Sequence, residues 1–280
     1  MSMFEHIKYS VCSDKGLVRG NNEDLYLVMP EEGVFAVADG MGGGSAGELA
    51  SAMLCEKLQK ALADTADESP GLRKYNAQQA MHAANDAVLA YAAEHKFDQM
   101  GTTLVLFLLD PWYPDRALLC HIGDSRAYLL RKKELRLLTE DHNVGATMPV
   151  RRGLFSGRLS EAEEHSRRLL TRAVGISRQV LPEWKTLELR PGDRLLLCTD
   201  GLTSMVDDKE IADVMRRFDT PEDIVASLRQ RILKAGAVDN FTLVCLQLAV
   251  DLPSAATPEQ AEMDESDYLM QIAEWRKDHA

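Results

Sequence analysis

Five aspartates of this chain share one feature: each lies within two residues of one end of a short apolar run of strand length. They are Asp24, Asp39, Asp124, Asp200 and Asp239. Carboxylates gathered at the edge of an apolar core repel one another and are costly to bury unpaired. Divalent cations would relieve that repulsion, and a ligand set made only of oxygens favours hard ions such as Mg²⁺ or Mn²⁺ over zinc. The pattern therefore predicts a divalent metal site.

Other interpretations of these residues fit less well. Asp-Gly between two apolar runs is an ordinary hairpin turn, but Asp39 and Asp200, each followed by glycine, precede helix-like sequence instead of a strand. The GGGSAG stretch at 42–47 matches a dinucleotide-binding fingerprint, yet a second helical segment stands where that motif requires a strand. The seven histidines form no HxH or HExxH pair. We expect His121 to be structural, and His142 stays open between a structural and a ligand role.

Hydrophobic periodicity predicts the elements that must position these residues. Apolar residues at helical spacing predict helices over 46–61, 77–91 and 224–235, the last opened by Thr220 and Pro221. The first two helices follow each other without an intervening strand, which suits an α+β layered fold better than βαβ units. Residues 143–176 are polar, arginine-rich and weakly periodic, and we expect a mobile excursion there. Apolar runs predict strands over 7–12, 25–29, 34–38, 103–109, 117–122, 127–131, 184–189, 194–198 and 241–250.

Composition limits the class of protein. The net charge of −12 over 280 residues argues against a nucleic-acid partner, because a phosphate backbone requires a basic surface. No apolar run reaches the roughly 18 residues of a membrane span, and the first residues do not resemble a secretory signal. The five cysteines are odd in number and show no CxxC spacing. Reduced thiols in a cytoplasmic protein without a membrane partner are therefore expected.

Eight sequence blocks follow one another along the chain: SDKGLVRGNNEDLYLV (13–28), GVFAVADGMGGGSAGELAS (33–51), MGTTLVLFLL (100–109), HIGDSRAYLLR (121–131), LTEDHN (138–143), LLTRAVG (169–175), GDRLLLCTDGLTSMV (192–206) and DNFTLVCL (239–246). In order and spacing these blocks resemble the type 2C (PPM) metal-dependent protein serine/threonine phosphatases, and the bacterial branch in particular. The resemblance implies an α+β fold with a central β-sandwich of two mostly antiparallel sheets, flanked by helix pairs, and a metal cleft at one end. It implies a phosphatase domain over 1–250, with a flap at 143–176.

The same resemblance implies a metal-binding role for five residues. Asp39 would bridge two Mn²⁺ or Mg²⁺ ions, and Gly40 would offer its carbonyl oxygen to one of them. Asp200 and Asp239 would complete the other site. Asp124 is similar to the ligand of a third, more labile ion near the flap.

Three further residues are implied to act on water and substrate. Glu23 and Asp24 would hold metal-bound waters, and Arg19 would grip the substrate phosphate with its planar fork. Two cations about 3.5–4 Å apart lower the pKa of a shared water and produce the hydroxide that attacks phosphorus. Animal members carry a histidine where this chain has Met41, and a thioether cannot donate a proton to the leaving group.

The implied activity is hydrolysis of phosphoserine and phosphothreonine on proteins. The substrates would be phosphorylated proteins, and the enzyme would oppose a bacterial serine/threonine kinase. Two alternatives belong to other classes: a regulatory pseudophosphatase that only binds, and a hydrolase of small phosphoesters. The presence of Asp39, Asp200, Asp239 and Arg19 argues against the first alternative, because a pseudoenzyme has no need for uncompensated acids. Comparing phosphopeptide with small-ester kinetics would test the second.

Residues 251–280 form an acidic tail beyond the resemblance. They carry eight acids against Arg276 and Lys277, a net charge of −6. Thr257-Pro258-Glu259-Gln260 has the features of a helix start. Tyr268, Leu269, Ile272 and Trp275 recur on one face. The pattern predicts a helix within 258–278, with its apolar face covered by the phosphatase domain or by a partner; a frayed tail is the alternative.

Overall fold

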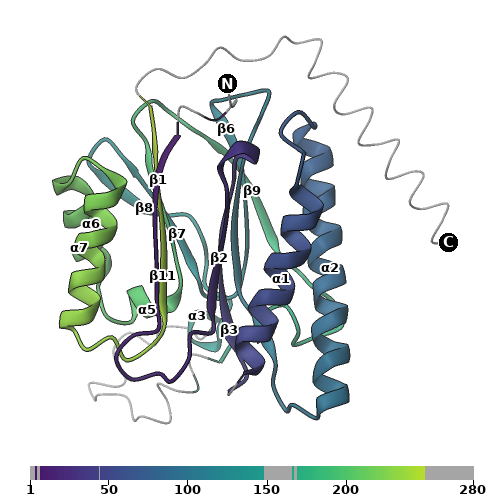
Figure 1. Ribbon diagram of the computed structural model, residues 1–280. Helices are drawn as coiled ribbons and strands as arrows, with labels where there is room; N and C mark the ends of the chain where they lie inside the picture. Colours follow the sequence, from purple (N-terminus) through teal and green to yellow (C-terminus); the bar gives the residue numbers. More distant parts are fainter. Residues whose placement is uncertain (1–3, 5–6, 44, 148–165, 167–168, 250–280) are drawn as a thin grey trace.

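Two antiparallel sheets face each other between two groups of helices in the computed structural model, which describes residues 4, 7–43, 45–147, 166 and 169–249 (Figure 1). The strands are β1 (Ile7–Asp14), β2 (Asp24–Met29), β3 (Val34–Met41), β4 (Gly101–Thr102), β5 (Leu104–Leu109), β6 (Arg116–Ile122), β7 (Arg126–Arg131), β8 (Glu134–Leu137), β9 (Glu183–Glu188), β10 (Arg194–Cys198) and β11 (Phe241–Leu248). The helices are the 3-10 turn η1 (Pro30–Glu32) and α1 (Ala46–Leu62), α2 (Pro70–His95), α3 (Val144–Thr147), α5 (Asp200–Thr203), α6 (Asp208–Arg217) and α7 (Pro221–Lys234).

The strand order explains the layered shape. One sheet has the order β1-β11-β10-β7-β8, and the other has β2-β3-β5-β6-β9 with the short β4 paired to β3. Helices α1 and α2 cover the second sheet, and α6 and α7 lie beside the first (Figure 1). This arrangement confirms the predicted α+β sandwich flanked by helix pairs.

The core has three layers that match the apolar runs. All six residues of β5 are buried, because one face packs against the other sheet and the opposite face against α1 and α2. A strand buried on both faces reads as a continuous apolar run, which is why β3, β5 and β10 stood out in the sequence. Leu54, Leu58 and Leu62 recur every four residues along the buried side of α1.

Helix starts follow the capping signals. The Thr220 hydroxyl accepts a hydrogen bond from the Asp223 N–H at 3.1 Å, and Pro221 opens α7, as predicted. Ser69 and Pro70 open α2 in the same way, with the Ser69 hydroxyl accepting from the Leu72 N–H at 3.1 Å. Helix α2 therefore begins seven residues before its predicted apolar face at 77–91.

Some elements differ from the sequence-based expectation. β8 reads ELRL, has no buried residue, and was not predicted because a polar edge strand lacks an apolar run. Within the predicted excursion at 143–176 an isolated bridge joins Asn143 to Leu170, and a second bridge joins Val174 to Thr102 of β4. Most of the excursion's interior, and the tail helix expected within 258–278, lie outside the described residues.

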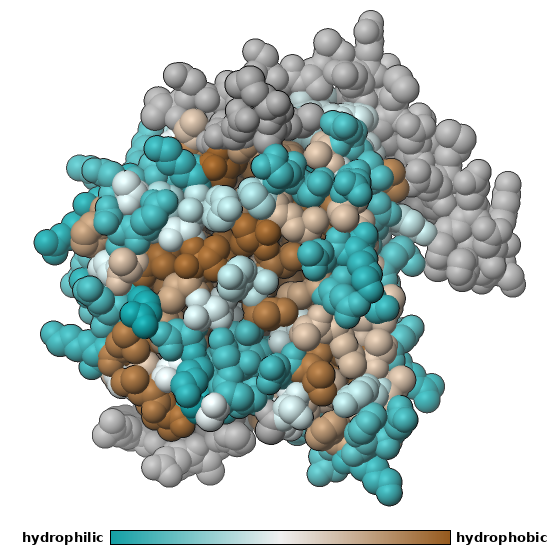
Figure 2. Space-filling model, in the orientation of Figure 1, coloured by the Kyte–Doolittle hydropathy of each residue, from teal (hydrophilic) through white to brown (hydrophobic). Residues whose placement is uncertain are grey.

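The surface over the two edge strands β1 and β2 is partly apolar. Figure 2 shows brown, apolar atoms gathered across the middle of this face, between more hydrophilic flanks. Tyr9, Leu25 and Tyr26 are the exposed large apolar side chains of these strands. Within the described residues, none of the helices has both the length and the apolar character needed to span a bilayer.

Arg73, at the N-terminal end of α2, is a buried cation with three oxygen acceptors. Its side chain is 1% exposed and donates to the carbonyl oxygens of Leu109 and Glu32 and, at 3.4 Å, to the Thr65 hydroxyl. Leu109 is the last residue of β5, and Glu32 ends η1 just before β3. Arg73 therefore ties α2 to the end of the sandwich where β3 begins.

We expect Arg73→Met to lower the free energy of unfolding by about 2–4 kcal/mol, because two buried carbonyls lose their donors. Urea unfolding followed by circular dichroism measures the loss, and Arg178→Met on the exposed surface is the control. A loss below about 0.5 kcal/mol, the usual range of a surface change, would contradict the role given to Arg73.

Candidate metal centre

A cleft of about 230 Å³ lies at the end of the sandwich opposite Arg73, where β3 runs into the turn before α1. Seven of the eight residues predicted for the site line it, and Asp24 is the exception. The cleft also contains Asn240, Thr103 and Leu170, for which the sequence suggested no function. The lining residues predicted from the sequence are Arg19, Glu23, Asp39, Gly40, Asp124, Asp200 and Asp239.

Asp24 and Asp39 face each other across the β2–β3 pair, where their Cα atoms are register partners. Asp24 is 5% exposed and lies behind the cleft, and its Oδ2 accepts a hydrogen bond from the Thr199 hydroxyl at 2.7 Å. The Asp39 N–H donates to Thr103 Oγ1 at 3.0 Å. Like charges directly opposite on paired strands destabilise a sheet, so this register needs compensation.

Asn240 holds the other side of the cleft together. Its Oδ1 accepts from the Glu23 N–H, and its Nδ2 donates to the carbonyl oxygens of Lys15 and Asn21, each at 2.9 Å. The loop between β1 and β2, which carries Arg19, is thus fixed to the start of β11. At the mouth of the cleft Arg19 Nη2 donates to Asp239 Oδ2 at 2.9 Å, and the Arg19 side chain is 52% exposed.

The turn from β3 into α1 depends on close backbone contact. A Cβ atom at Gly40 would collide with the Gly47 backbone, and one at Gly47 would collide with Glu23 Oε2. The two glycines therefore allow the first turn of α1 to lie against Glu23 and the end of β3. Gly40 itself lines the cleft.

Burial and mutual repulsion raise the pKa of several of these acids. Burial, followed by the charges of Asp24, Asp200, Asp124 and Asp239, raises the pKa of Asp39 well above its usual value. Burial is also the main cause that raises the pKa of Asp24 and of Asp124 to about 7, with Asp200 contributing to both. The pKa of Glu23 is raised as well, chiefly by burial. The protein alone does not stabilise these carboxylates in their charged form.

The donor set fits divalent cations with a preference for oxygen. Among the described residues that line the cleft, Arg19 is the one cation, against five carboxylates. Asp39, Asp124, Asp200, Asp239 and the Gly40 carbonyl would be the protein ligands. Hard ions such as Mn²⁺ and Mg²⁺ take this kind of ligand set, and their charge would offset the repulsion that raises the pKa values.

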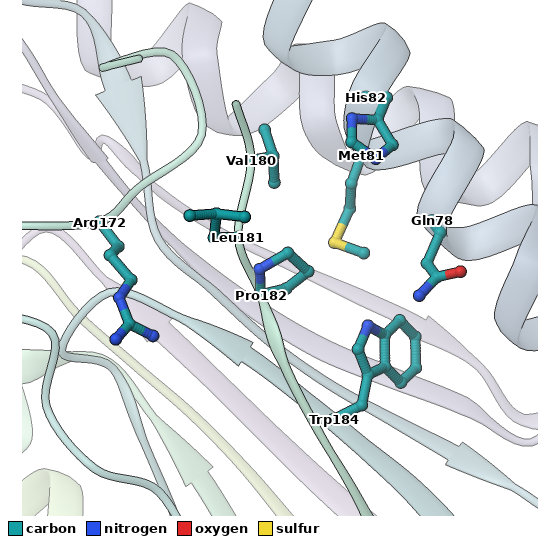
Figure 3. Close-up of a pocket in the computed structure, with 8 residues that line it drawn as sticks. All are labelled: Gln78, Met81, His82, Arg172, Val180, Leu181, Pro182 and Trp184. Carbon is teal, nitrogen blue, oxygen red and sulfur yellow. The ribbon is translucent and has the colours of Figure 1, made fainter. Parts of the chain in front are cut away.

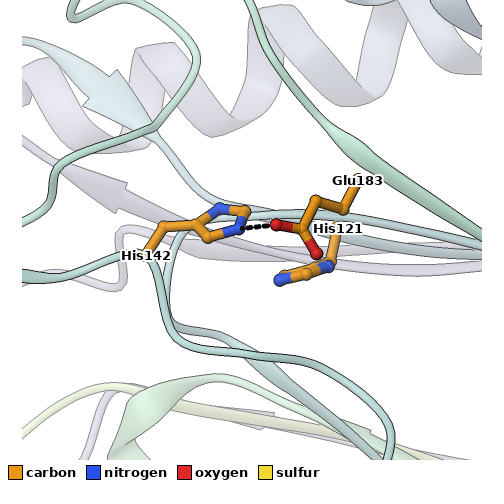
Figure 4. A group of neighbouring side chains, drawn as sticks. All are labelled: His121, His142 and Glu183. Carbon is orange, nitrogen blue, oxygen red and sulfur yellow. Dashed lines mark hydrogen bonds and ion pairs between the residues drawn. The ribbon is translucent and has the colours of Figure 1, made fainter. Parts of the chain in front are cut away.

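A second group of ionisable side chains lies next to the Asp124 turn. The candidate ligand atoms of His121, His142 and Glu183 lie within 4.8 Å of one another (Figure 4). His142 Nδ1 accepts from the Gly123 N–H at 3.2 Å, and its Nε2 lies 3.1 Å from Glu183 Oε1 and 3.2 Å from Arg172 Nη1. The Arg172 guanidinium also lies 3.0 Å from Glu183 Oε1.

These contacts favour a structural role for the two histidines over a metal site. A metal on His142 Nε2 would move the ring proton to Nδ1, where it would face the Gly123 N–H donor. Arg172 already supplies the positive charge that Glu183 requires. His142 connects the Gly123–Asp124 turn to β9, and this connection favours a structural role for its side chain.

A larger cavity of about 400 Å³ lies between α2 and the segment that leads into β9 (Figure 3). Gln78, Met81 and His82 reach it from α2, and Leu181, Pro182 and Trp184 from the other side. No carboxylate lines this cavity among the described residues. We therefore place the chemistry in the smaller, acidic cleft.

Sequence and structure comparisons relate this chain to known protein phosphatases. The family model for protein phosphatase 2C matches residues 15–240. The serine/threonine protein phosphatase PstP of Mycobacterium tuberculosis is 39% identical over 245 residues, which are 85% of this chain and 44% of that protein. The chain thus spans less than half the length of this relative. Protein phosphatase PhpP of Streptococcus pneumoniae is 33% identical over 250 residues, 86% of this chain and 98% of that protein.

One similar solved structure contains bound metal ions. The catalytic domain of PstP in complex with two manganese ions superposes with a TM-score of 0.70 and 36% identity, covering 87% of this chain and 98% of that one. The fold is therefore shared with a domain that binds two Mn²⁺ ions.

The raised pKa values predict how stability depends on pH without metal. Asp24 and Asp124 titrate near 7 in the folded state and near 4 when unfolded, so between these values the folded state holds more protons. Stability in EDTA should therefore fall as pH rises from about 4 to 7. We expect the melting temperature in EDTA to be higher at pH 5.5 than at pH 7.5. Mn²⁺ should raise it more at pH 7.5, because protons compete with metal for the same oxygens.

Differential scanning fluorimetry at both pH values, with EDTA or with Mn²⁺, makes this measurement. Asp39→Asn removes one acid from the group and should flatten the pH dependence in EDTA. A melting temperature in EDTA that falls on acidification to pH 5.5 would contradict the repulsion described above.

Proposed function

The chain belongs to the protein phosphatase 2C family, and from that premise we propose that it hydrolyses phosphoserine and phosphothreonine esters on proteins. The observation that carries the proposal is the cleft itself, in which five carboxylates gather around one space and Arg19 stands at its mouth. Two divalent ions bound there would supply the positive charge that a phosphate dianion requires and would acidify the attacking water. A third ion at Asp124 is part of the same proposal.

The contribution of the protein's own residues is to hold the ions and the water in position. Asp39, Gly40, Asp200 and Asp239 would hold the two ions, from backbone fixed by β3, α5 and the turn before β11. Glu23 and Asp24 are both buried, so they would orient water in the cleft from behind the ligands. Each is held by a hydrogen bond from a separate element: Asn240 fixes the Glu23 backbone, and Thr199 fixes the Asp24 carboxylate.

Arg19 would bind the substrate phosphate. Its guanidinium is half exposed and stands at the cleft mouth, so it can turn from Asp239 to an incoming phosphate. A planar fork that donates two parallel hydrogen bonds fixes a phosphate in orientation as well as in position. Solvent exposure of Arg19 leaves room for the rest of a large substrate outside the cleft.

We further propose a setting for the reaction. Relatives named as protein phosphatases support phosphorylated proteins as substrates, and a serine/threonine kinase would generate them. The acidic net charge disfavours nucleic acid as a substrate. The five cysteines are free and four of them are buried, which supports a reducing, cytoplasmic location.

Asp39→Asn should reduce hydrolysis of a phosphothreonine peptide, assayed with saturating Mn²⁺, to below about 1% of wild type. The physical reason is the loss of a charged ligand from the centre of the cleft. The variant should remain folded, because one fewer buried acid lessens repulsion in the absence of metal. Asp86→Asn on the exposed face of α2 is the matched control and should keep full activity. EDTA should abolish the wild-type rate. Turnover by Asp39→Asn near the wild-type rate would refute the assignment.

Arg19→Ala should weaken binding of the substrate phosphate by about 1.5–3 kcal/mol, the usual value of hydrogen bonds to a charged group. We expect mainly a raised KM, with a smaller loss in kcat. Inhibition by inorganic phosphate should weaken in parallel. Arg19→Lys keeps the charge without the fork and should lie between wild type and Arg19→Ala. Unchanged KM and kcat in both variants would show that Arg19 does not bind the substrate phosphate.

A further inference from the structure

An apolar groove of about 480 Å³ opens beside the acidic cleft. The two spaces share Met41 and Leu170 as lining residues, so the groove continues directly from the cleft. Its remaining apolar wall comes from the C-terminal part of α2 and from segments on both sides of the bridge between Thr102 and Val174. Leu89, Phe97, Leu169 and Ile176 belong to this wall.

The groove begins close to the proposed site of chemistry. Met41 follows Asp39 by two residues on β3, so both side chains leave the strand on the same face, about 7 Å apart along it. A phosphate held at Asp39 would thus place the neighbouring residues of its peptide near Met41. One to three residues of extended chain cover that distance and the length of the groove.

The apolar wall is exposed and yet rigid. Leu169 is 46% exposed and Ile176 is 38% exposed, and both line the groove next to the acidic cleft. Asn85, a buried residue of α2, accepts from the Gly175 N–H at 2.8 Å and donates to the Ser177 carbonyl oxygen at 3.0 Å. Both neighbours of Ile176 are thereby fixed to α2. A wall that is already ordered loses less conformational entropy of its own when a ligand binds.

We propose that this groove binds an apolar side chain of the phosphoprotein substrate, within three residues of the phosphorylated serine or threonine. The proposal rests on the proposed function, because the phosphate in the cleft is what brings the peptide to the groove. It assigns to the groove a preference for leucine, isoleucine, methionine or phenylalanine beside the phosphorylated residue. The cleft recognises the phosphate, and the groove distinguishes one phosphoprotein from another.

Charge and position favour this occupant over two others. The segment 251–280 carries a net charge of −6 and would meet Asp98 in the groove and the five carboxylates next to it. A second copy of the chain seated on Met41 and Leu170 would close the cleft. A substrate side chain uses the groove only while its own phosphate occupies the cleft, so the two spaces are filled together.

The test compares a glycine-flanked phosphothreonine heptapeptide with six peptides that carry a single leucine, moved from three residues before to three residues after the phosphothreonine. With the full chain and Mn²⁺, leucine at one or two positions should raise kcat/KM by roughly tenfold, mostly through KM. Equal kcat/KM for all seven peptides would overturn the proposal.

A change of specificity separates recognition from simple damage. Ile176→Lys places a cation in the groove wall, and it should remove the leucine preference and create a preference for glutamate at the same peptide position. The readout is the ratio of kcat/KM for the leucine peptide to kcat/KM for the glycine-flanked peptide, because a general loss of activity cancels in this ratio. Ile176→Leu should retain the leucine preference. Leu181→Lys, at a 60% exposed residue outside the groove, is the matched control and should behave as wild type.

Each remaining outcome also decides. A leucine preference that persists in Ile176→Lys overturns the proposal. A second outcome also overturns it: the wild type is a dimer in gel filtration and Ile176→Lys is a monomer, because the groove would then be an interface between copies. If the wild type hydrolyses none of the peptides, the proposed function is wrong. In that case fluorescence anisotropy with labelled leucine and glycine phosphopeptides tests the groove separately, and equal Kd values would refute it.

Discussion

The structure depends on forcing like charges together at one end of a sandwich. Asp24 and Asp39 are register partners on neighbouring strands, and Asp124, Asp200 and Asp239 surround them from other elements. The free energy that holds them there comes from elsewhere, from apolar layers between the sheets and beneath both helix groups. Because the backbone of β3 is buried along its length, the carboxylates cannot separate by moving the strand. The remaining ways to lower the repulsion are to take up protons or to bind cations.

A network of uncharged polar side chains keeps this end in shape. Thr103, Thr199 and Asn240 each join a backbone or carboxylate group of one element to that of another, and all three are buried. His142 has the same function for the Gly123–Asp124 turn. Buried hydrogen bonds of this kind are costly to break, so the cleft has its shape before a substrate arrives. Electrostatic catalysis requires that preorganisation, because groups that must reorient during the reaction lose much of their effect.

The sequence predicted what local patterns encode. Continuous apolar runs identified the strands buried on both faces, Thr220 and Pro221 identified the start of α7, and four of the five aspartates singled out in the sequence line the cleft. It could not predict contacts between residues far apart in the chain. Asn240 lies 217 residues from Glu23, whose backbone it fixes, and nothing in a run of sequence signals that pairing. β8 was missed because its ELRL stretch has no buried residue, and Arg73 because a cation on a helix normally faces water. The apolar groove was not predicted either, because its wall is also formed by contacts between distant parts of the chain. It combines α2 with segments about 80 residues further along.

The position of Arg73 implies that the two ends of the molecule differ in local opening. Arg73 joins α2 to the backbone beside β3 and β5 at one end, and the repelling carboxylates occupy the other. Partial unfolding of a domain starts where its contacts are least favourable. In the absence of cations, amide hydrogen exchange should therefore be fastest around the cleft and slowest near Arg73. Cation binding would then change the order in which parts of the chain open, and with it the sites at which a protease first cuts.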